Sequence, residues 1–306
     1  METARQPASC ARCQGRLYYF DKQGDRGLAR ACACTKTCTR CEGRGFLYAQ
    51  IEETFSARVG PRSYEVLTPC PCQLLGRRIE RYNEAGLPAV LAASTFDGYQ
   101  TPTQAQATAA QLARQFALEY PQGRGFVLSG PVGTGKTHLL AATLAYAIIE
   151  KGARAKYVEM SLLFNDIRRG FQQGKSGGEV IGPLAEVDLL AIDELGRGRG
   201  SPFELDTIDD LIARRYNAGK LTLFATNYSL APPEQKPQGK APSGYKSTED
   251  VKSLAKESAL LVDRIGERIY SRLCEMCTFI EFPPATPDMR RQRQELEGTH
   301  FRARAR

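Results

Sequence analysis

A glycine-rich segment at residues 130–137, Gly-Pro-Val-Gly-Thr-Gly-Lys-Thr, has the residue types and spacing needed to bind a triphosphate. It follows the apolar run 126–129 and opens an apolar-periodic segment that extends to Ile149, which predicts a strand-to-helix turn. Backbone N–H groups of such a turn surround the phosphates, and the positive end of the following helix points at them. Lys136 adds a point charge and Thr137 a hydroxyl ligand for Mg²⁺, so the segment is predicted to be a P-loop.

Further polar residues follow two downstream apolar runs. Asp193 and Glu194 end the run 187–192, and Asn227 comes shortly after the run 221–225. Asp193 is suited to hold Mg²⁺ through water, while Glu194 could polarise the water that attacks the γ-phosphate. The Asn227 amide could orient the same water. In the run 263–273, Arg268 and Arg272 are four residues apart, on one helical face, so either could reach a phosphate.

Eight of the ten cysteines lie before residue 73, and they form a repeat. The segments 10–18 and 38–46 share the pattern Cys-x2-Cys-x-Gly-Arg, and each leads through a β-rich stretch with a central turn to a closing Cys-x-Cys. This pattern indicates a duplicated zinc ribbon, in which four thiolates hold a structural zinc with no open position for substrate. A segment with so little apolar content needs metal binding to supply its folding energy.

Two groupings of these cysteines are open. The favoured grouping takes each repeat as one Zn²⁺ site, with Cys10, Cys13, Cys32 and Cys34 in the first and Cys38, Cys41, Cys70 and Cys72 in the second. In the interleaved grouping, Cys32, Cys34, Cys38 and Cys41 form an inner site, which resembles the cysteine-rich module of DnaJ-type chaperones. The remaining pair, Cys274 and Cys277, lies in the apolar run 273–282 and is expected in the core rather than at a metal.

The order of the apolar runs predicts the fold. Strands are expected at 155–160, 187–192 and 221–225, with helices at 161–171 and 205–217, and this alternation implies parallel strands joined by crossover helices. The predicted fold class is α/β, a three-layer αβα P-loop NTPase sandwich preceded by a small zinc-ribbon β domain. The predicted domains are a tandem zinc ribbon at 1–72, a helical linker at 73–93, an ATPase domain at 94–290 with a flexible insertion at 231–262, and a basic tail at 291–306.

Composition restricts the compartment and the partners. The 306 residues carry a net charge of +8, which favours phosphate backbones or acidic proteins as partners. No stretch approaches a membrane span and the first nine residues have no apolar signal core, so no membrane contact is expected. Unpaired cysteines in a chain without a secretory signal fit a reducing compartment, and a cytoplasmic location is predicted.

Taken together, the motifs resemble AAA+ ATPases, specifically the DnaC/DnaI-type helicase loaders of bacteria and the related IstB-type transposition helpers. The resemblance rests on Gly-Pro-x-Gly-Thr-Gly-Lys-Thr-His-Leu at 130–139, Asp-Leu-Leu-x-Ile-Asp-Glu-Leu-Gly at 188–196, Ala-Thr-Asn at 225–227 and Gly-x-Arg-x-x-Ser-Arg-Leu at 266–273. It implies an ATP site with Mg²⁺ on Thr137 and Asp193. Its other residues are Gly130, Pro131, Val132, Gly133, Thr134, Gly135, Lys136 and His138.

The resemblance also implies a function. It makes the chain a slow ATPase, stimulated by a partner or by DNA, that loads or remodels a replicative DNA helicase and binds single-stranded DNA along 161–171. Arg272 matches the arginine finger of a homo-oligomer with ATP at subunit interfaces, and Arg268 is the second candidate. A transposition helper is the same-class alternative. An alternative of a different class is a zinc-ribbon adaptor that binds ATP with little turnover, which Glu194 argues against.

Overall fold

The computed structural model describes residues 10–34, 38, 40–54, 61–174, 176–198, 201–230 and 260–291. The chain divides into two compact units, the first made of Met1–Glu84 and Pro88–Ala93 and the second of Ala85–Leu87 and Ser94–Arg306. None of the helices in the described ranges has both the length and the apolar content needed to span a bilayer. Most of the predicted insertion, residues 231–259, and the predicted tail from residue 292 lie outside these ranges.

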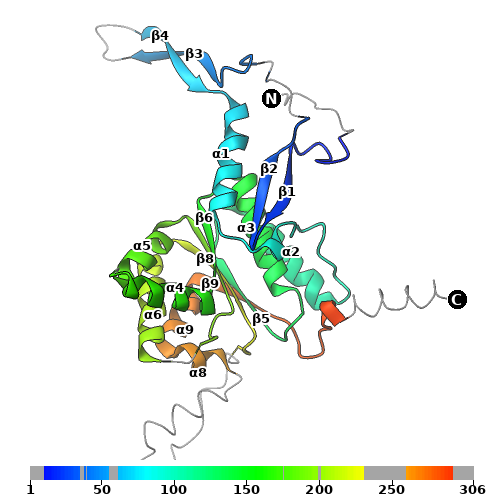
Figure 1. Ribbon diagram of the computed structural model, residues 1–306, viewed down its shortest axis with the longest axis vertical. Helices are drawn as coiled ribbons and strands as arrows, with labels where there is room; N and C mark the ends of the chain where they lie inside the picture. The colour runs from blue at the N-terminus through cyan, green and yellow to red at the C-terminus, as the bar shows by residue number, and fades with distance from the viewer. Residues whose placement is uncertain are drawn as a thin grey trace, which may run out of the picture. The chain divides into compact units, whose positions relative to one another are not determined.

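The first unit consists of two β-hairpins and one helix (Figure 1). Its elements are β1 (Tyr18–Gln23), β2 (Arg26–Ala31), β3 (Phe46–Thr54), β4 (Pro61–Pro69), α1 (Pro71–Glu84) and the 3-10 turn η1 (Ala89–Leu91). Helix α1 is tied to β2, because the side-chain amide of Asn83 accepts from Ala29 N at 2.8 Å and donates to Ala29 O at 3.2 Å. Tyr82 is buried, stacks near Phe20 and donates to Ala92 O at 2.8 Å. The segment predicted as a linker therefore contributes to the packing of this unit.

The second unit is built on a five-stranded parallel sheet in the order β6-β7-β8-β5-β9. The strands are β5 (Gly125–Ser129), β6 (Ala155–Glu159), β7 (Leu189–Asp193), β8 (Leu221–Thr226) and β9 (Cys277–Glu281). β5 lies between β8 and β9, with Leu128 opposite Ala225 on one side and Ile280 on the other. All five residues of β5 and of β7 are buried, as expected for parallel strands covered on both faces.

Helices cover both faces of this sheet, as Figure 1 shows. α2 (Gln104–Glu119) and α3 (Lys136–Ile149) lie on one face, and the helices of the other face are α4 (Met160–Gln172), α5 (Gly177–Glu186), α6 (Pro202–Asn217), α8 (Leu261–Ile265) and α9 (Glu267–Met276). The core on this second face contains buried residues from all five helices, among them Phe164, Leu211 and Leu273. The predicted three-layer α/β sandwich is confirmed.

Three features differ from the sequence expectations. Helix α5 was not predicted, because its glycines and Pro183 are poor helix formers; a capping box between Ser176 and Glu179 begins it. The helical run 263–273 is interrupted at Gly266, whose φ of 83° separates α8 from α9. The last residues of the predicted insertion belong to the ordered fold, since Leu261 is fully buried and donates through its backbone N–H to Ser229 O at 2.8 Å.

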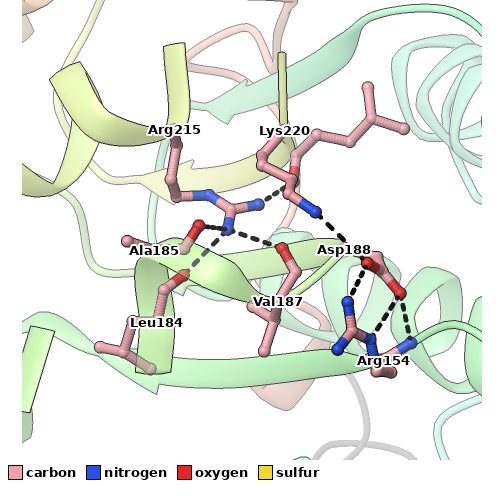
Figure 2. A network of polar contacts seen from close by, with 8 residues as sticks. Arg154, Leu184, Ala185, Val187, Asp188, Arg215 and Lys220 are labelled. Carbon is pink, nitrogen blue, oxygen red and sulfur yellow. Dashed lines mark hydrogen bonds and ion pairs between the residues drawn. The ribbon is translucent and has the colours of Figure 1, made fainter. Parts of the chain in front are cut away.

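A fully buried arginine, Arg215 of α6, stabilises the end of α5 (Figure 2). Its Nη1 donates to the carbonyls of Leu184, Ala185 and Val187 at 2.8, 3.2 and 2.9 Å. The last carbonyls of a helix have no partner within the helix, and a cation there also complements the helix dipole. Nε donates to Thr222 Oγ1 at 2.9 Å, so the guanidinium joins α5, α6 and β8. Burial lowers the pKa of Arg215 to about 10, which leaves it charged at neutral pH.

Replacing Arg215 with Leu is expected to lower the free energy of unfolding by about 3 kcal/mol or more, because several buried carbonyls lose their donor. The matched control is Arg214→Leu, whose guanidinium is half-exposed and pairs with Asp210 at 2.9 Å. Loss of that surface pair is expected to lower the free energy of unfolding by less than about 1 kcal/mol. Urea unfolding of the two variants measures the difference, and equal losses would contradict the assigned role of Arg215.

Candidate nucleotide and metal sites

The predicted P-loop joins β5 to α3, and its backbone adopts conformations that favour glycine. Gly130, Gly133 and Gly135 have φ angles of 134°, 81° and 98°. A Cβ at Gly130 would lie 2.5 Å from Phe282 O, and a Cβ at Gly133 would lie 2.0 Å from Asp288 Oδ1. These glycines are therefore required both by their dihedral angles and by the close approach of the segment after β9.

Lys136, the first residue of α3, is only 6% exposed, and its ammonium turns back into the loop. Nζ donates to Gly130 O at 2.8 Å and to Pro131 O at 2.6 Å. Burial lowers the pKa of Lys136 to about 8, although the nearby Asp193 carboxylate favours the charged form. A cation at the base of the glycine turn is suited to meet the phosphates of a nucleotide.

Asp193 and Glu194 stand at the end of β7, and β8 separates β7 from β5 in the sheet. Asp193 is 6% exposed and its two carboxylate oxygens are held separately. Oδ2 accepts from Tyr157 Oη at 2.8 Å, and Oδ1 accepts from Glu194 N at 2.9 Å. These two hydrogen bonds orient the carboxylate that was predicted to hold Mg²⁺.

Glu194 carries one engaged and one free oxygen. Its Oε1 forms an ion pair with Arg197, whereas Oε2 is buried and has no hydrogen-bond partner among the described residues. Its backbone φ of 56° is uncommon outside glycine. Burial, followed by the neighbouring Glu159 carboxylate, raises the pKa of Glu194, while Arg197 opposes that shift. An orphaned buried oxygen at this position fits a site in which the carboxylate faces a water beside a nucleotide.

The other residues predicted around the nucleotide lie at the same edge of the sheet. Thr137 is half-buried in the first turn of α3, and His138 bonds Thr95 O through Nε2 at 2.8 Å. Asn227 is exposed just beyond β8, where the Thr226 hydroxyl donates to Leu195 O at 2.7 Å. The donors and carboxylates brought together fit a nucleotide with Mg²⁺.

The two candidate finger residues, Arg268 and Arg272, share one partner within the chain. Both lie on α9, and both pair with Asp209 of α6. Arg272 is 20% exposed at the side chain and forms the closer pair with Oδ1, whereas Arg268 is 75% exposed and lies 3.5 Å from Oδ2. Asp209 thus holds Arg272 against α6 and leaves Arg268 largely in solvent.

The eight amino-terminal cysteines gather into two groups of four, Cys10/Cys13/Cys32/Cys34 and Cys38/Cys41/Cys70/Cys72, whose sulfurs lie within 4.8 Å of one another in each group. This is the grouping by repeat and not the interleaved one. The S–S distances are 3.7 Å for Cys10–Cys32, 3.4 Å for Cys13–Cys34, 3.8 Å for Cys38–Cys70 and 3.6 Å for Cys41–Cys72. A tetrahedral shell with Zn–S bonds of about 2.3 Å needs S–S separations of about 3.8 Å, so both groups fit zinc.

The two knuckles have the same backbone geometry. Arg16 N donates to Cys13 O at 2.9 Å and Arg44 N to Cys41 O at 2.8 Å, and the glycines that follow each second cysteine have φ angles near 80°. Gly45 N donates to Cys41 Sγ at 3.3 Å. This hydrogen bond is the largest cause that lowers the pKa of Cys41 to about 7, and backbone N–H groups of Cys13 and Arg12 lower that of Cys10 to about 6. Thiolates stabilised in this way are prepared to bind metal.

Cys274 and Cys277 lie outside both groups. Cys277 is buried in the core, as predicted, and donates to Thr222 O at 3.5 Å, but the core position predicted for Cys274 is wrong, because its side chain is exposed on α9. Sequence reasoning missed several residues of the nucleotide site, namely Tyr99, Gln106, Tyr157, Glu159, Arg197 and Asp288. No sequence pattern assigned a role to these side chains, so only their position against the predicted residues identifies them.

Comparison with protein families matches residues 75–238 to the IstB-like ATP binding protein model. The chain belongs to the IstB-like ATP-binding protein family. This match covers the P-loop, the Asp193-Glu194 pair and Asn227, and it extends back into α1. An ATP-binding family with this fold agrees with the AAA+ resemblance of the sequence.

Several known proteins are similar to this chain. The replicative helicase loader DnaC of Escherichia coli (strain K12) is 28% identical over 151 residues, which cover 49% of this chain and 61% of DnaC. A putative ATP-binding protein of an insertion sequence of Mycobacterium tuberculosis, Rv3427c, is 26% identical over 137 residues, 44% of this chain and 54% of that protein. A crystal structure of the DnaC helicase loader has 27% identity and a TM-score of 0.49 over 62% of this chain and 97% of that chain. In the sequence match, this chain spans about three fifths of the length of DnaC.

Metal analysis of the purified protein is expected to return two zinc ions per chain, because each group of four thiolates forms a closed shell. Cys13→Ser is expected to reduce the content to one, since three thiolates leave the first shell incomplete. Cys274→Ser, which changes an exposed cysteine outside both groups, is the control and should keep two. A folded wild-type chain with fewer than two zinc ions would contradict the assignment.

Proposed function

We propose that this protein hydrolyses ATP and loads or remodels a replicative DNA helicase, holding single-stranded DNA and the helicase in turn. The observation that carries this proposal is the meeting of Lys136, Asp193 and Glu194 at one edge of the sheet, in a chain of the IstB-like family that is similar to DnaC. A site that only binds nucleotide has little use for a buried carboxylate with one free oxygen.

The residues divide the work of hydrolysis among them. Amides of residues 130–135 and the Lys136 ammonium bind the β- and γ-phosphates, as in other P-loops. Thr137 and Asp193 would hold Mg²⁺, which neutralises developing charge on the phosphates when it is bound. Glu194 Oε2 accepts the proton of the attacking water, while Arg197 holds Oε1 and so fixes the direction in which Oε2 points. Asn227 is exposed at the same edge and would orient the water.

A complete site in this proposal needs a second subunit. Arg272 and Arg268 lie on α9 and pair with Asp209 of α6, so neither is assigned to phosphates of its own chain. We assign Arg272 as the finger that enters the neighbouring subunit's ATP site and Arg268 as its supporting cation. An arginine supplied in this way stabilises charge on the transferred phosphoryl group and makes turnover depend on assembly, which fits a slow, stimulated ATPase.

Single-stranded DNA is proposed to contact α4. Phe164 is buried in the core and Arg168 pairs with Glu204 at 2.6 Å, so these two residues serve the fold. Arg169 is 67% exposed and Phe171 is 46% exposed, with the Phe171 ring 5.6 Å from that of Phe203. An exposed cation is suited to contact a phosphate, and an exposed aromatic ring is suited to stack on a base.

The cysteine module is proposed to dock the partner. Tyr18 and Phe20 pack within the first unit. Phe46, Tyr48 and Leu67 on the second hairpin are 45%, 70% and 58% exposed. Tyr48 and Leu67 face each other across the strands, so their side chains form one apolar surface.

A transposition helper is the second candidate function, favoured by the family model and by the relative from an insertion sequence. Both candidates use the same ATP site, so the partner distinguishes them. Glu194→Gln, which should trap bound ATP, is the form to use as bait in a pull-down against the replicative helicase and a transposase of the same host. Capture of the hexameric helicase supports the loader; capture of a transposase instead replaces it.

Glu194→Gln is expected to retain ATP affinity and lose hydrolysis by about a hundredfold or more, because the amide cannot accept the proton. Lys136→Ala should lose ATP binding itself. Glu150→Gln, an exposed change at the end of α3, is the control and should leave both properties unchanged. Equilibrium binding and phosphate release measure the two effects. Wild-type turnover in Glu194→Gln would show that a different residue is the general base.

Mixing variants tests the shared site. Arg272→Ala is expected to lower turnover by about a thousandfold, and Lys136→Ala to be inactive. A mixture of the two should recover activity, because the Lys136→Ala subunits supply Arg272 to intact P-loops. Recovery is not expected from an unfolded Arg272→Ala chain, so the result does not depend on stability. If Arg268→Ala shows this behaviour in place of Arg272→Ala, the finger is Arg268; no loss in either excludes a finger on α9.

A further inference from the structure

One carbonyl of the P-loop, that of Thr134, accepts two side-chain hydrogen bonds from outside the loop. Tyr99 Oη donates to it at 3.1 Å and Gln106 Nε2 at 3.2 Å. Tyr99 follows the 3-10 turn region before α2, and Gln106 lies in the first turns of α2. Both residues precede β5, so a segment unrelated to the glycine motif approaches its centre.

The Gln106 side chain has a single orientation available. It is fully buried, and its Oε1 accepts from Thr103 Oγ1 at 2.8 Å. Thr103 in turn caps α2 by accepting from Gln106 N at 3.4 Å. Because the hydroxyl occupies Oε1, the amide NH₂ group is left to face Thr134 O. A buried amide with both ends paired is costly to rearrange.

The Tyr99 ring is fixed by its packing against neighbouring residues. A Cβ at Gly135 would lie 2.5 Å from Tyr99 Cε2, so the ring packs directly on the P-loop backbone. The ring also lies near that of His138, at 5.4 Å between centroids. Burial raises the pKa of Tyr99 above its ordinary value, so the phenol keeps its proton and donates at neutral pH.

The hydrogen bonds that Thr134 O accepts also set the direction of the next N–H group, because both belong to one peptide. A trans peptide is planar, and its C=O and N–H groups point in opposite directions. With Thr134 O drawn toward Tyr99 and Gln106, the N–H of Gly135 is turned to the opposite side, into the loop. The preceding peptide is held in the same way, since Gly133 O accepts from Met289 N at 3.0 Å.

We propose that Tyr99 and Gln106 are positioning residues that set the P-loop amides in place for the β-phosphate of ATP or ADP. The proposal rests on the nucleotide site proposed above. It states that the P-loop amides that recognise the diphosphate are already oriented before the nucleotide binds. Amides already turned inward lose less freedom on binding, which increases affinity for the phosphate they meet. This gain in affinity depends on the β-phosphate, so the affinity for AMP, which lacks that phosphate, is not increased.

The test compares nucleotides by their number of phosphates. Tyr99→Phe keeps the ring against Gly135 and removes one donor, and Gln106→Leu removes the other. Each is expected to weaken ATP and ADP binding by about tenfold, and the double variant by more, while AMP affinity stays unchanged. Calorimetry measures ATP and ADP, and competition at high concentration measures AMP. Gln104→Leu, on the exposed side of α2, is the matched control and should bind all three as the wild type does.

Each outcome has a distinct meaning. Wild-type affinity for ADP in the double variant overturns the positioning role, and so does an equal loss for ADP and AMP, since that indicates general damage to the site. Gln106→Leu removes a buried pair and could unfold the chain, but Tyr99→Phe keeps the packing and gives the same comparison of ADP with AMP. A wild-type chain that binds neither ATP nor ADP overturns the nucleotide site itself and not this inference alone.

Discussion

The parallel pairing of five strands is the constraint on which the second unit depends. Because the strands run in one direction, their carboxyl ends meet at one edge, and the residues that follow them are brought together. The P-loop follows β5, Asp193 ends β7, and Glu159 lies directly opposite Asp193 at the end of β6. Candidate catalytic groups that are far apart in the sequence therefore meet at one edge of the sheet.

Buried polar side chains then form hydrogen bonds with groups that have no partner within the sheet or the helices. Arg215 binds the carbonyls at the end of α5, Gln106 binds a carbonyl of the P-loop, and Tyr157 orients Asp193. Each of these groups would be costly to bury alone, and each has its partners in place. The same physical rule thus stabilises a weak helix in one place and orients a candidate catalytic group in another.

The cysteine module needs a different source of stability, since it has little apolar surface to bury. Most side chains of β3 and β4 are exposed, and a two-stranded hairpin is marginal by itself. The sulfurs at the base of each hairpin stand at zinc-like separations, so metal would replace the missing core. Leaving apolar residues such as Tyr48 on the surface is then compatible with stability, and it leaves a face available to a partner.

Features that depend on neighbouring residues could be predicted from the sequence. The P-loop, the acidic pair after β7 and the cysteine knuckles follow from local backbone chemistry, and the alternation of apolar runs was sufficient for the three-layer sandwich. The break at Gly266, the buried role of Arg215 and the anchoring of Thr134 were not predictable. The last depends on contacts across 28 and 35 positions of chain, and packing alone chooses such partners. A residue type limits which bonds a side chain could make, but the folded backbone decides which partner lies within reach.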